Sequence, residues 1–293
     1  MILKLAFEEF IINQQIKGNS MYTVKYYVQS LKPFFVFIGD NYDVASVTLS
    51  DLNNYYISLV ALQISSSSVQ TYIRALRSFL NWCYSENYTI SCLPEKFRLP
   101  KAKRKVIDIL TPSEIQCLMT SFNTQNIIQL RNYCICLLML DSGLRMSEIT
   151  SLKLSSVHIP ESYIIVDGKG NKQRIVPLGL HSRKALLKYI SNRPPVSYDN
   201  LFLTISYTPI DNTAIKNMFR KLKVKTGIKR IRAHLLRHTF ATLYLENGGD
   251  IYSLQSILGH TSLEMVKKYI HITHRKTIVN FTSFSPIDNL TKN

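Results

Sequence analysis

The sequence predicts a mainly helical chain with one small β-sheet (an α+β fold), organised as two domains. Three observations support this prediction. Apolar residues recur at helical spacing along most of the 293 residues. One pair of short β-branched runs flanks a glycine-containing turn, as in a β-hairpin. A segment with two prolines and six cations interrupts both patterns, and two domains suit a chain of this length at about 100–200 residues per domain.

Residues 1–93 are predicted to form a compact helical domain. Serine precedes two of its helices, and serine is a favourable N-cap because its side chain accepts a hydrogen bond from a free backbone N–H group. The second helix is predicted to end where a glycine follows the periodic pattern. In chain order, the predicted helices run from about Leu5 to Ile16, from Ser20 to the residue before Gly39, from after Ser50-Asp51 through Leu59, and from the serine tract at residues 65–68 through Trp82-Cys83.

Residues 94–108 are predicted to form a basic interdomain linker, since they combine prolines with clustered cations and show no periodicity. The second domain is predicted to span residues 109–293. It opens at a capping box, in which Thr111 precedes Pro112 and Glu114. Its further elements are predicted as helices at about Ile127–Leu140 and Leu144–Leu152, strands at Tyr163–Val166 and Arg174–Val176 around the turn Gly168–Lys172, and largely helical structure after Ser182, with a short extended run at Leu201–Leu203.

The composition favours a nucleic-acid partner and excludes several classes of protein. Lysine and arginine number 36 against 19 aspartates and glutamates, a formal charge of +17. Cations cluster within residues 96–105 and 216–232, as is typical of proteins that bind polyanions. The longest apolar run, Tyr133–Leu140, is far shorter than the roughly 20 residues that cross a bilayer, and no signal peptide is predicted. Five cysteines, an odd number, favour a reducing interior, so we expect a cytoplasmic protein. The expected nucleic-acid partner would place it at the nucleoid.

Five local motifs carry side chains suited to phosphate chemistry. Arg145 opens a helix after Gly143, where its guanidinium joins the free backbone N–H groups of the helix N-terminus in an anion site. Three-residue spacing places His234 and Arg237 on one face of a helix. No metal site is predicted, because the histidines have no third ligand in register. In chain order, the six residues are Arg145, Lys169 in the hairpin turn, His234, Arg237, His260 after a helix-ending glycine, and Tyr269.

Together these motifs resemble the tyrosine recombinase (phage integrase) family, and most closely its Xer-type members. The likeness rests on four sequence segments: SGLRMSEITSLKL, GKGNKQRIVPL, HLLRHTFAT and LGHTSLEMVKKYIH. The resemblance implies a SAM-like core-binding domain followed by a catalytic domain. It also implies a site-specific recombinase that cuts and rejoins DNA through a 3′-phosphotyrosine intermediate and a Holliday junction. Chromosome-dimer resolution and the integration, excision or resolution of a mobile element are the expected roles.

The resemblance further implies a role for each matched residue. Arg145 and Arg237 would hold the non-bridging oxygens of the scissile phosphate, and Tyr269 would attack its phosphorus. No cofactor is implied. His234 would be the general base and Lys169 the general acid. His260 would donate to a phosphate oxygen, and Glu148 would orient the arginines.

The implied partner is double-stranded DNA with inverted half-sites, bound by a homotetramer that is a dimer of dimers. A homologous recombinase or an accessory factor is a further partner left open. Two alternatives also stay open: a DNA-binding regulator of the same fold without strand transfer, and a type IB topoisomerase-like enzyme that nicks and closes one duplex. The residues expected to contact DNA are Arg74, Arg77, Lys96, Arg98, Lys101, Lys103, Arg104, Lys105, Lys172, Arg174, Arg230 and Arg232.

Overall fold

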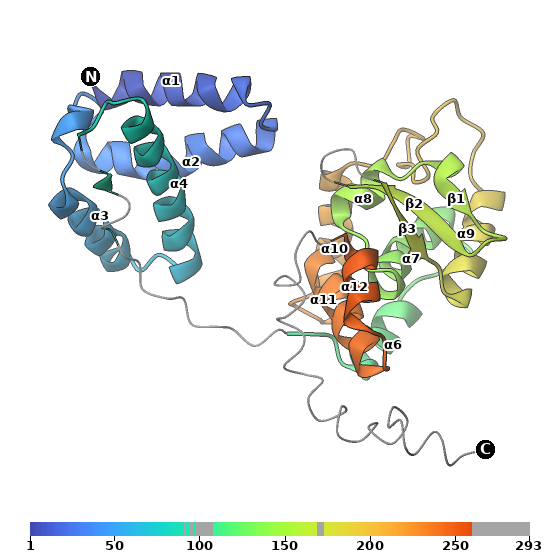
Figure 1. Cartoon of the computed structure of the whole chain (residues 1–293). Helices are drawn as coiled ribbons and strands as arrows, with labels where there is room; N and C mark the ends of the chain where they lie inside the picture. The colour runs from blue at the N-terminus through green and yellow to red at the C-terminus, as the bar shows by residue number, and fades with distance from the viewer. Residues whose placement is uncertain (91, 94–96, 98–107, 169–172, 260–293) are drawn as a thin grey trace, which may run out of the picture. The chain divides into compact units, whose positions relative to one another are not determined.

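The computed structural model describes residues 1–90, 92–93, 97, 108–168 and 173–259. The chain divides into two compact units, an N-terminal unit (Met1–Lys105) and a C-terminal unit (Val106–Asn293), and Figure 1 shows both. Helices dominate both units, and a small antiparallel sheet lies in the C-terminal unit. The predicted mainly helical fold with one small sheet is therefore confirmed. Within the described residues, none of the helices combines the length and the apolar character needed to cross a membrane.

The N-terminal unit is helical throughout its described part. Its core is rich in aromatic side chains: the ring of Phe10 lies 5.0 Å from that of Tyr27 and 5.5 Å from those of Phe79 and Trp82. The elements are α1 (Leu3–Ile16), α2 (Met21–Ile38), the 3₁₀ turn η1 (Val44–Ser46), α3 (Leu49–Ala61) and α4 (Ser66–Ser85). The ring contacts tie together α1, α2 and α4.

The N-caps explain where these helices begin. Ser20 accepts a hydrogen bond from the backbone N–H of Thr23, as its position before a periodic run predicts. The third helix begins at Leu49, earlier than expected. The reason is a capping box at Thr48, whose side chain accepts from the backbone N–H of Asp51 while the Asp51 carboxylate accepts from the backbone N–H of Thr48.

The C-terminal unit packs its helices around α7, which contacts both α9 and α11. The capping box predicted at Thr111 and Glu114 is present at the start of its first helix. In chain order, its elements are α6 (Pro112–Thr120), α7 (Ile127–Asp141), α8 (Met146–Ser151), η2 (Leu154–Ser156), β1 (Val157–His158), β2 (Tyr163–Asp167), β3 (Gln173–Pro177), α9 (Leu180–Ser191), α10 (Asn212–Thr226), α11 (Ala233–Glu246) and α12 (Ile251–Leu258).

The sheet has the order β1-β2-β3, and both pairings are antiparallel. The predicted hairpin is its β2–β3 part, in which Ile164 pairs with Val176 and both side chains face the core. The third strand, β1, was not predicted. The run at Leu201–Leu203 forms no strand, and Leu203 makes a single bridge to Pro209. The sheet contacts α8 through β2 and α12 through β3.

Candidate phosphate-binding site

Three arginines from distant parts of the C-terminal unit converge on the C-terminal end of α12. The last carbonyl groups of a helix have no intrahelical partner and attract cations. Arg174 Nε donates to the carbonyl oxygen of Ile257 at 2.7 Å, and Arg237 Nη2 donates to that of Leu258 at 2.8 Å. Arg145 Nη2 approaches the carbonyl oxygen of Gly259 at 3.4 Å. The end of α12 is thus the point at which these guanidinium groups meet.

Arg145 precedes α8 in extended conformation, and Glu148 in the first turn of that helix holds it. The Glu148 carboxylate accepts the Arg145 backbone N–H at 2.8 Å and its Nη1 at 2.8 Å. The Arg145 side chain remains about one-third exposed. Its guanidinium is therefore fixed at one edge and accessible at the surface, which suits contact with an anion.

Glu148 is a buried carboxylate, only 4% exposed, and it is fully paired. Arg174 donates to its two oxygens from Nη1 and Nη2, each at 2.9 Å. Burial raises the pKa of Glu148, but the hydrogen bonds from Arg174 and Arg145 outweigh burial and lower the pKa overall. The carboxylate is thus ionised at neutral pH and orders both arginines.

Arg237 lies on α11 and is buried, with 6% of its surface exposed. Its Nη1 donates to the carbonyl oxygen of Gly143, in the turn between α7 and α8, as well as bonding to the end of α12. His234 is exposed in the first turn of the same helix, three residues earlier. The structure therefore brings together Arg145, Glu148 and Arg237, and it places His234 one helical turn from Arg237.

Two arginines expected to face DNA are instead bonded within the protein. Arg174 has an 11% exposed side chain and pairs with Glu148, because alternation along β3 directs it to the same face as the core residue Val176. Arg230 pairs with Asp108 and with Glu114, and it donates to the carbonyl oxygen of Ile109. Sequence reasoning missed the bridging position of Arg174, although its two-residue spacing from Val176 was a usable signal.

The other expected DNA contacts fall into two groups. Arg74 and Arg232 are exposed, and Arg77 is half-buried on α4. Arg74 donates to the Gln70 side chain one turn earlier. The predicted residues that lie outside the described part of the chain are Lys96, Arg98, Lys101, Lys103, Arg104, Lys105, Lys169, Lys172, His260 and Tyr269.

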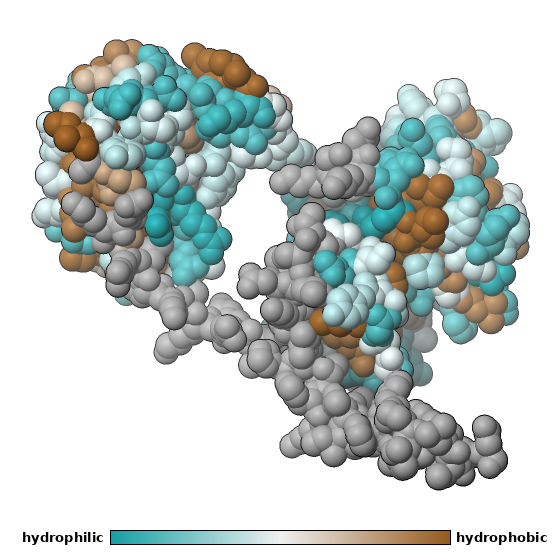
Figure 2. Space-filling view, in the orientation of Figure 1, coloured by the Kyte–Doolittle hydropathy of each residue, from teal (hydrophilic) through white to brown (hydrophobic). Residues whose placement is uncertain are grey.

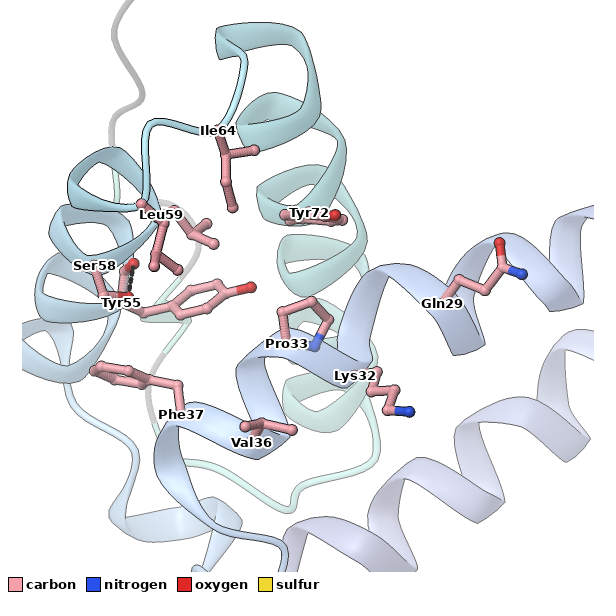
Figure 3. Close-up of a pocket in the computed structure, with 11 residues that line it drawn as sticks. Gln29, Lys32, Pro33, Val36, Phe37, Tyr55, Ser58, Leu59, Ile64 and Tyr72 are labelled. Carbon is pink, nitrogen blue, oxygen red and sulfur yellow. Dashed lines mark hydrogen bonds between the residues drawn. The ribbon is translucent and has the colours of Figure 1, made fainter.

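A separate pocket lies in the N-terminal unit, and mostly apolar side chains line it, in contrast to the charged arginine site. Its volume is about 490 Å³, and Figure 3 shows Tyr55 and Leu59 of α3 facing Pro33 of α2 and Tyr72 of α4. The Tyr55 hydroxyl is buried there without a hydrogen-bond partner among the described residues. None of the residues selected from the sequence lines this pocket, so it is not part of the arginine site.

The surface of the N-terminal unit also carries apolar side chains. Figure 2 shows a hydrophobic patch at its top edge, where Figure 1 places α1. Leu5, Ile12 and Ile16 of α1 are exposed. In the part of the chain that the structure describes, no group of three or more His, Cys, Asp and Glu side chains could hold a metal ion.

Two family models match the chain. The model of the phage integrase family matches residues 108–276, and that of the phage integrase N-terminal SAM-like domain matches residues 6–87. These spans fall within the two units of the fold.

Curated relatives match the chain over nearly its whole length. Tyrosine recombinase XerD from Oceanobacillus iheyensis is 30% identical, and the match covers 97% of this chain and 99% of that protein. A tyrosine recombinase from Pseudothermotoga lettingae is 33% identical over 92% of this chain and 93% of its own. Among solved structures, the Tn1549 transposon integrase in complex with a circular intermediate DNA aligns with a TM-score of 0.78 and 20% identity, over 97% of this chain and 100% of that chain.

Proposed function

Because the chain belongs to the phage integrase family of tyrosine recombinases, we propose that its site-specific recombination proceeds through a covalent bond between Tyr269 and a DNA 3′-phosphate. The Tyr269 phenolic oxygen attacks phosphorus, and the bond from phosphorus to the 5′-oxygen breaks. Attack by a 5′-hydroxyl of the partner strand then reverses the step and releases the tyrosine. The phosphotyrosine bond conserves the energy of the broken linkage, so rejoining needs no nucleotide cofactor.

The convergence of Arg145 and Arg237 carries this proposal. They lie 92 positions apart in the sequence, yet Arg237 bonds to the carbonyl of Leu258 and Arg145 approaches that of the next residue, Gly259. Two guanidinium groups held this closely suit the two non-bridging oxygens of one phosphate. They also oppose the negative charge that grows in the pentacoordinate transition state.

Proton transfers complete the proposed mechanism. His234 acts as the general base that takes the Tyr269 proton, since the pKa of a free tyrosine is about 10 and the phenol needs assistance at neutral pH. Lys169 acts as the general acid that protonates the leaving 5′-oxygen. His260 donates a hydrogen bond to a phosphate oxygen. In this scheme, fixed cations supply the charge stabilisation that metal ions supply to other phosphoryl transfers.

The positive charge of the chain supports a duplex DNA substrate. Residues 94–108 serve as a basic linker between a core-binding domain at 1–93 and a catalytic domain at 109–293, and the cations of this linker contact the DNA backbone. Protomers bind inverted half-sites, and four of them exchange strands through a Holliday junction in the nucleoid. The biological reaction is chromosome-dimer resolution or the movement or resolution of a mobile element.

Covalent cleavage of DNA tests the proposal. Duplexes from the DNA that flanks the gene, each carrying a nick that traps the cleaved state, are incubated with the wild type, Tyr269→Phe and Tyr252→Phe. Tyr252 is a suitable control because it is an exposed tyrosine, on α12. Denaturing gels should show a protein–DNA adduct for the wild type and for Tyr252→Phe, and none for Tyr269→Phe. An adduct that persists in Tyr269→Phe removes this residue from the mechanism, and duplex binding without any adduct indicates a regulator.

A further inference from the structure

Arg174 is not among the residues that carry the proposed reaction, and it was expected only to contact DNA, yet it connects three segments of the site. Its Nη1 and Nη2 donate to the two oxygens of Glu148, and its Nε donates to the carbonyl oxygen of Ile257. These bonds occupy three of the five N–H donors of the guanidinium. One side chain thus joins strand β3 to the start of α8 and to the end of α12.

Glu148 depends on Arg174 for half of its hydrogen bonds. Its Oε1 accepts from Arg145 Nη1 and Arg174 Nη1, and its Oε2 accepts from the Arg145 backbone N–H and Arg174 Nη2. A carboxylate has about four lone-pair sites, so all of them are filled. Without Arg174, two acceptor sites of a carboxylate that is 4% exposed would lose their partner. Such a buried charge is costly unless it is paired, and Glu148 would then move and take Arg145 with it.

The end of α12 is shaped around the same side chain. Gly259 ends the helix in the left-handed conformation, with a φ of +61°. A Cβ atom at this position would lie 3.0 Å from Cδ and 3.1 Å from Nε of Arg174. Glycine therefore permits both the turn and the close approach of the arginine. The chain continues directly from this turn to His260.

We propose that Arg174 is a positioning residue, which fixes Arg145 through Glu148 and holds the end of α12 at Ile257 and Gly259. It belongs to strand β3, and Lys169 lies five positions before it in the sequence. Arg174 therefore bonds to Glu148, which holds Arg145, and to the end of α12, which precedes His260 in the sequence. All of the Arg174 bonds named above are to groups of the protein. This inference rests on the proposed function, because the reaction being positioned is cleavage by Tyr269.

The test separates cleavage from DNA binding in the full-length protein. The probe is a nicked duplex that carries the cleavage site found for the wild type. For Arg174→Gln, we expect the single-turnover rate of adduct formation to fall about 100-fold, the size of effect that a displacement of about 1 Å produces in a catalytic group. The affinity for the duplex should stay at the wild-type value, since the Arg174 side chain is only 11% exposed and its guanidinium bonds to Glu148 and Ile257.

Arg193→Gln is the matched control. Arg193 is also a partly buried arginine of the C-terminal unit, and it donates to the carbonyl oxygens of Leu201, Tyr198 and Asn200. A merely structural role for Arg174 predicts similar urea midpoints and similar small effects on cleavage for both variants. Arg174→Lys covers the case in which the glutamine variant does not fold. A lysine keeps the charge but has no planar fork for two carboxylate oxygens, so its rate should fall between wild type and Arg174→Gln.

A double variant completes the test. If Arg174 acts through Glu148, the fall in rate for Glu148→Gln with Arg174→Gln should be no larger than that of the more severe single variant, because residues that act as a unit are not additive. Wild-type cleavage rates in Arg174→Gln or Arg174→Lys, or a loss of rate matched by an equal loss of DNA affinity, would overturn the inference alone. A wild-type protein that forms no adduct would overturn the proposed function as well.

Discussion

The glycine between α7 and α8 shows how one missing side chain shapes the site. Gly143 has a φ of +64°, and a Cβ atom there would lie 2.4 Å from Cδ1 of Phe240 on α11. Its carbonyl oxygen also accepts a hydrogen bond from Arg237. The turn therefore needs glycine for its backbone conformation and for the close approach of α11, and it holds Arg237 in place.

Replacing Gly143 by alanine should cost more stability than the same change at Gly227. Gly227 has a φ of +72° with open space around it. Gly227→Ala should therefore lose only the free energy of backbone strain, about 1–2 kcal/mol. At Gly143, overpacking against Phe240 should add roughly 1–3 kcal/mol. Urea unfolding of both variants measures the difference. Equal losses of stability in the two variants would show that α11 can shift away from the new side chain at no cost in free energy. Cleavage assays would then show whether Arg237 has moved.

At the same scale, the sequence identified Arg145 and Arg237 because each lies in a distinctive local motif, and the structure brings them together. The charge of Arg174 suggested a DNA contact, but charge does not tell which way a side chain points, and the structure pairs this arginine with Glu148. The direction follows from alternation on β3, where Val176 is buried. Two of the four bonds on Glu148 come from Arg174, 26 positions away in the sequence, and these two have no local signal.

Among the elements, α6 joins local capping to a long-range ion pair. Glu114 accepts the Thr111 backbone N–H at 2.8 Å and pairs with Arg230, which precedes α11. The hydrogen bond from Arg230 and the capping bond lower the pKa of Glu114 to about 2. Glutamine can also occupy this position of a capping box and accept the backbone hydrogen bond, so Glu114→Gln removes the charge and keeps the cap.

The sign of the pH effect follows from the lowered pKa. Because the folded protein prefers the ionised carboxylate, this stabilisation is fully present above the ordinary pKa of 4.5 and is lost as the pH falls through about 2. Glu114→Gln should therefore unfold more easily at pH 7, by about 1 kcal/mol, and the deficit should shrink below pH 4.5. Urea unfolding at pH 7, 5 and 3 measures it, with the exposed Glu161→Gln as control. A deficit that is the same at every pH would assign the effect to lost hydrogen bonds and not to charge.

The elements that could be predicted are those with signals inside their own sequence. Helices at Ser20 and Thr111 begin where their caps indicate, since capping involves neighbouring residues. Strand β1 has only two residues and exists through its pairing with Ile164 and Tyr163, so it has no run of its own to detect. The run at Leu201, which was expected to be extended, is held by a backbone hydrogen bond to the carbonyl of Leu152, which is far away in the sequence.

On the scale of the whole molecule, each unit has its own core. One cluster of buried side chains lies between Leu3 and Phe97, and the other between Leu110 and Leu258. A unit that buries its apolar surface internally has what independent folding requires. The aromatic contacts of Phe10 lie within the N-terminal unit, and the paired charges around Glu148 lie within the C-terminal unit.

We therefore predict that residues 1–105 and 106–293 each fold when produced alone. Each fragment should show a single cooperative transition in urea by circular dichroism, and each transition should coincide with one of those of the full chain, because the two cores share no residue. An equimolar mixture of the fragments is the control for association. A fragment 106–293 that binds duplex DNA and unfolds cooperatively, beside a fragment 1–105 that remains unfolded, would show that the N-terminal core requires its neighbour, contrary to this division of the chain.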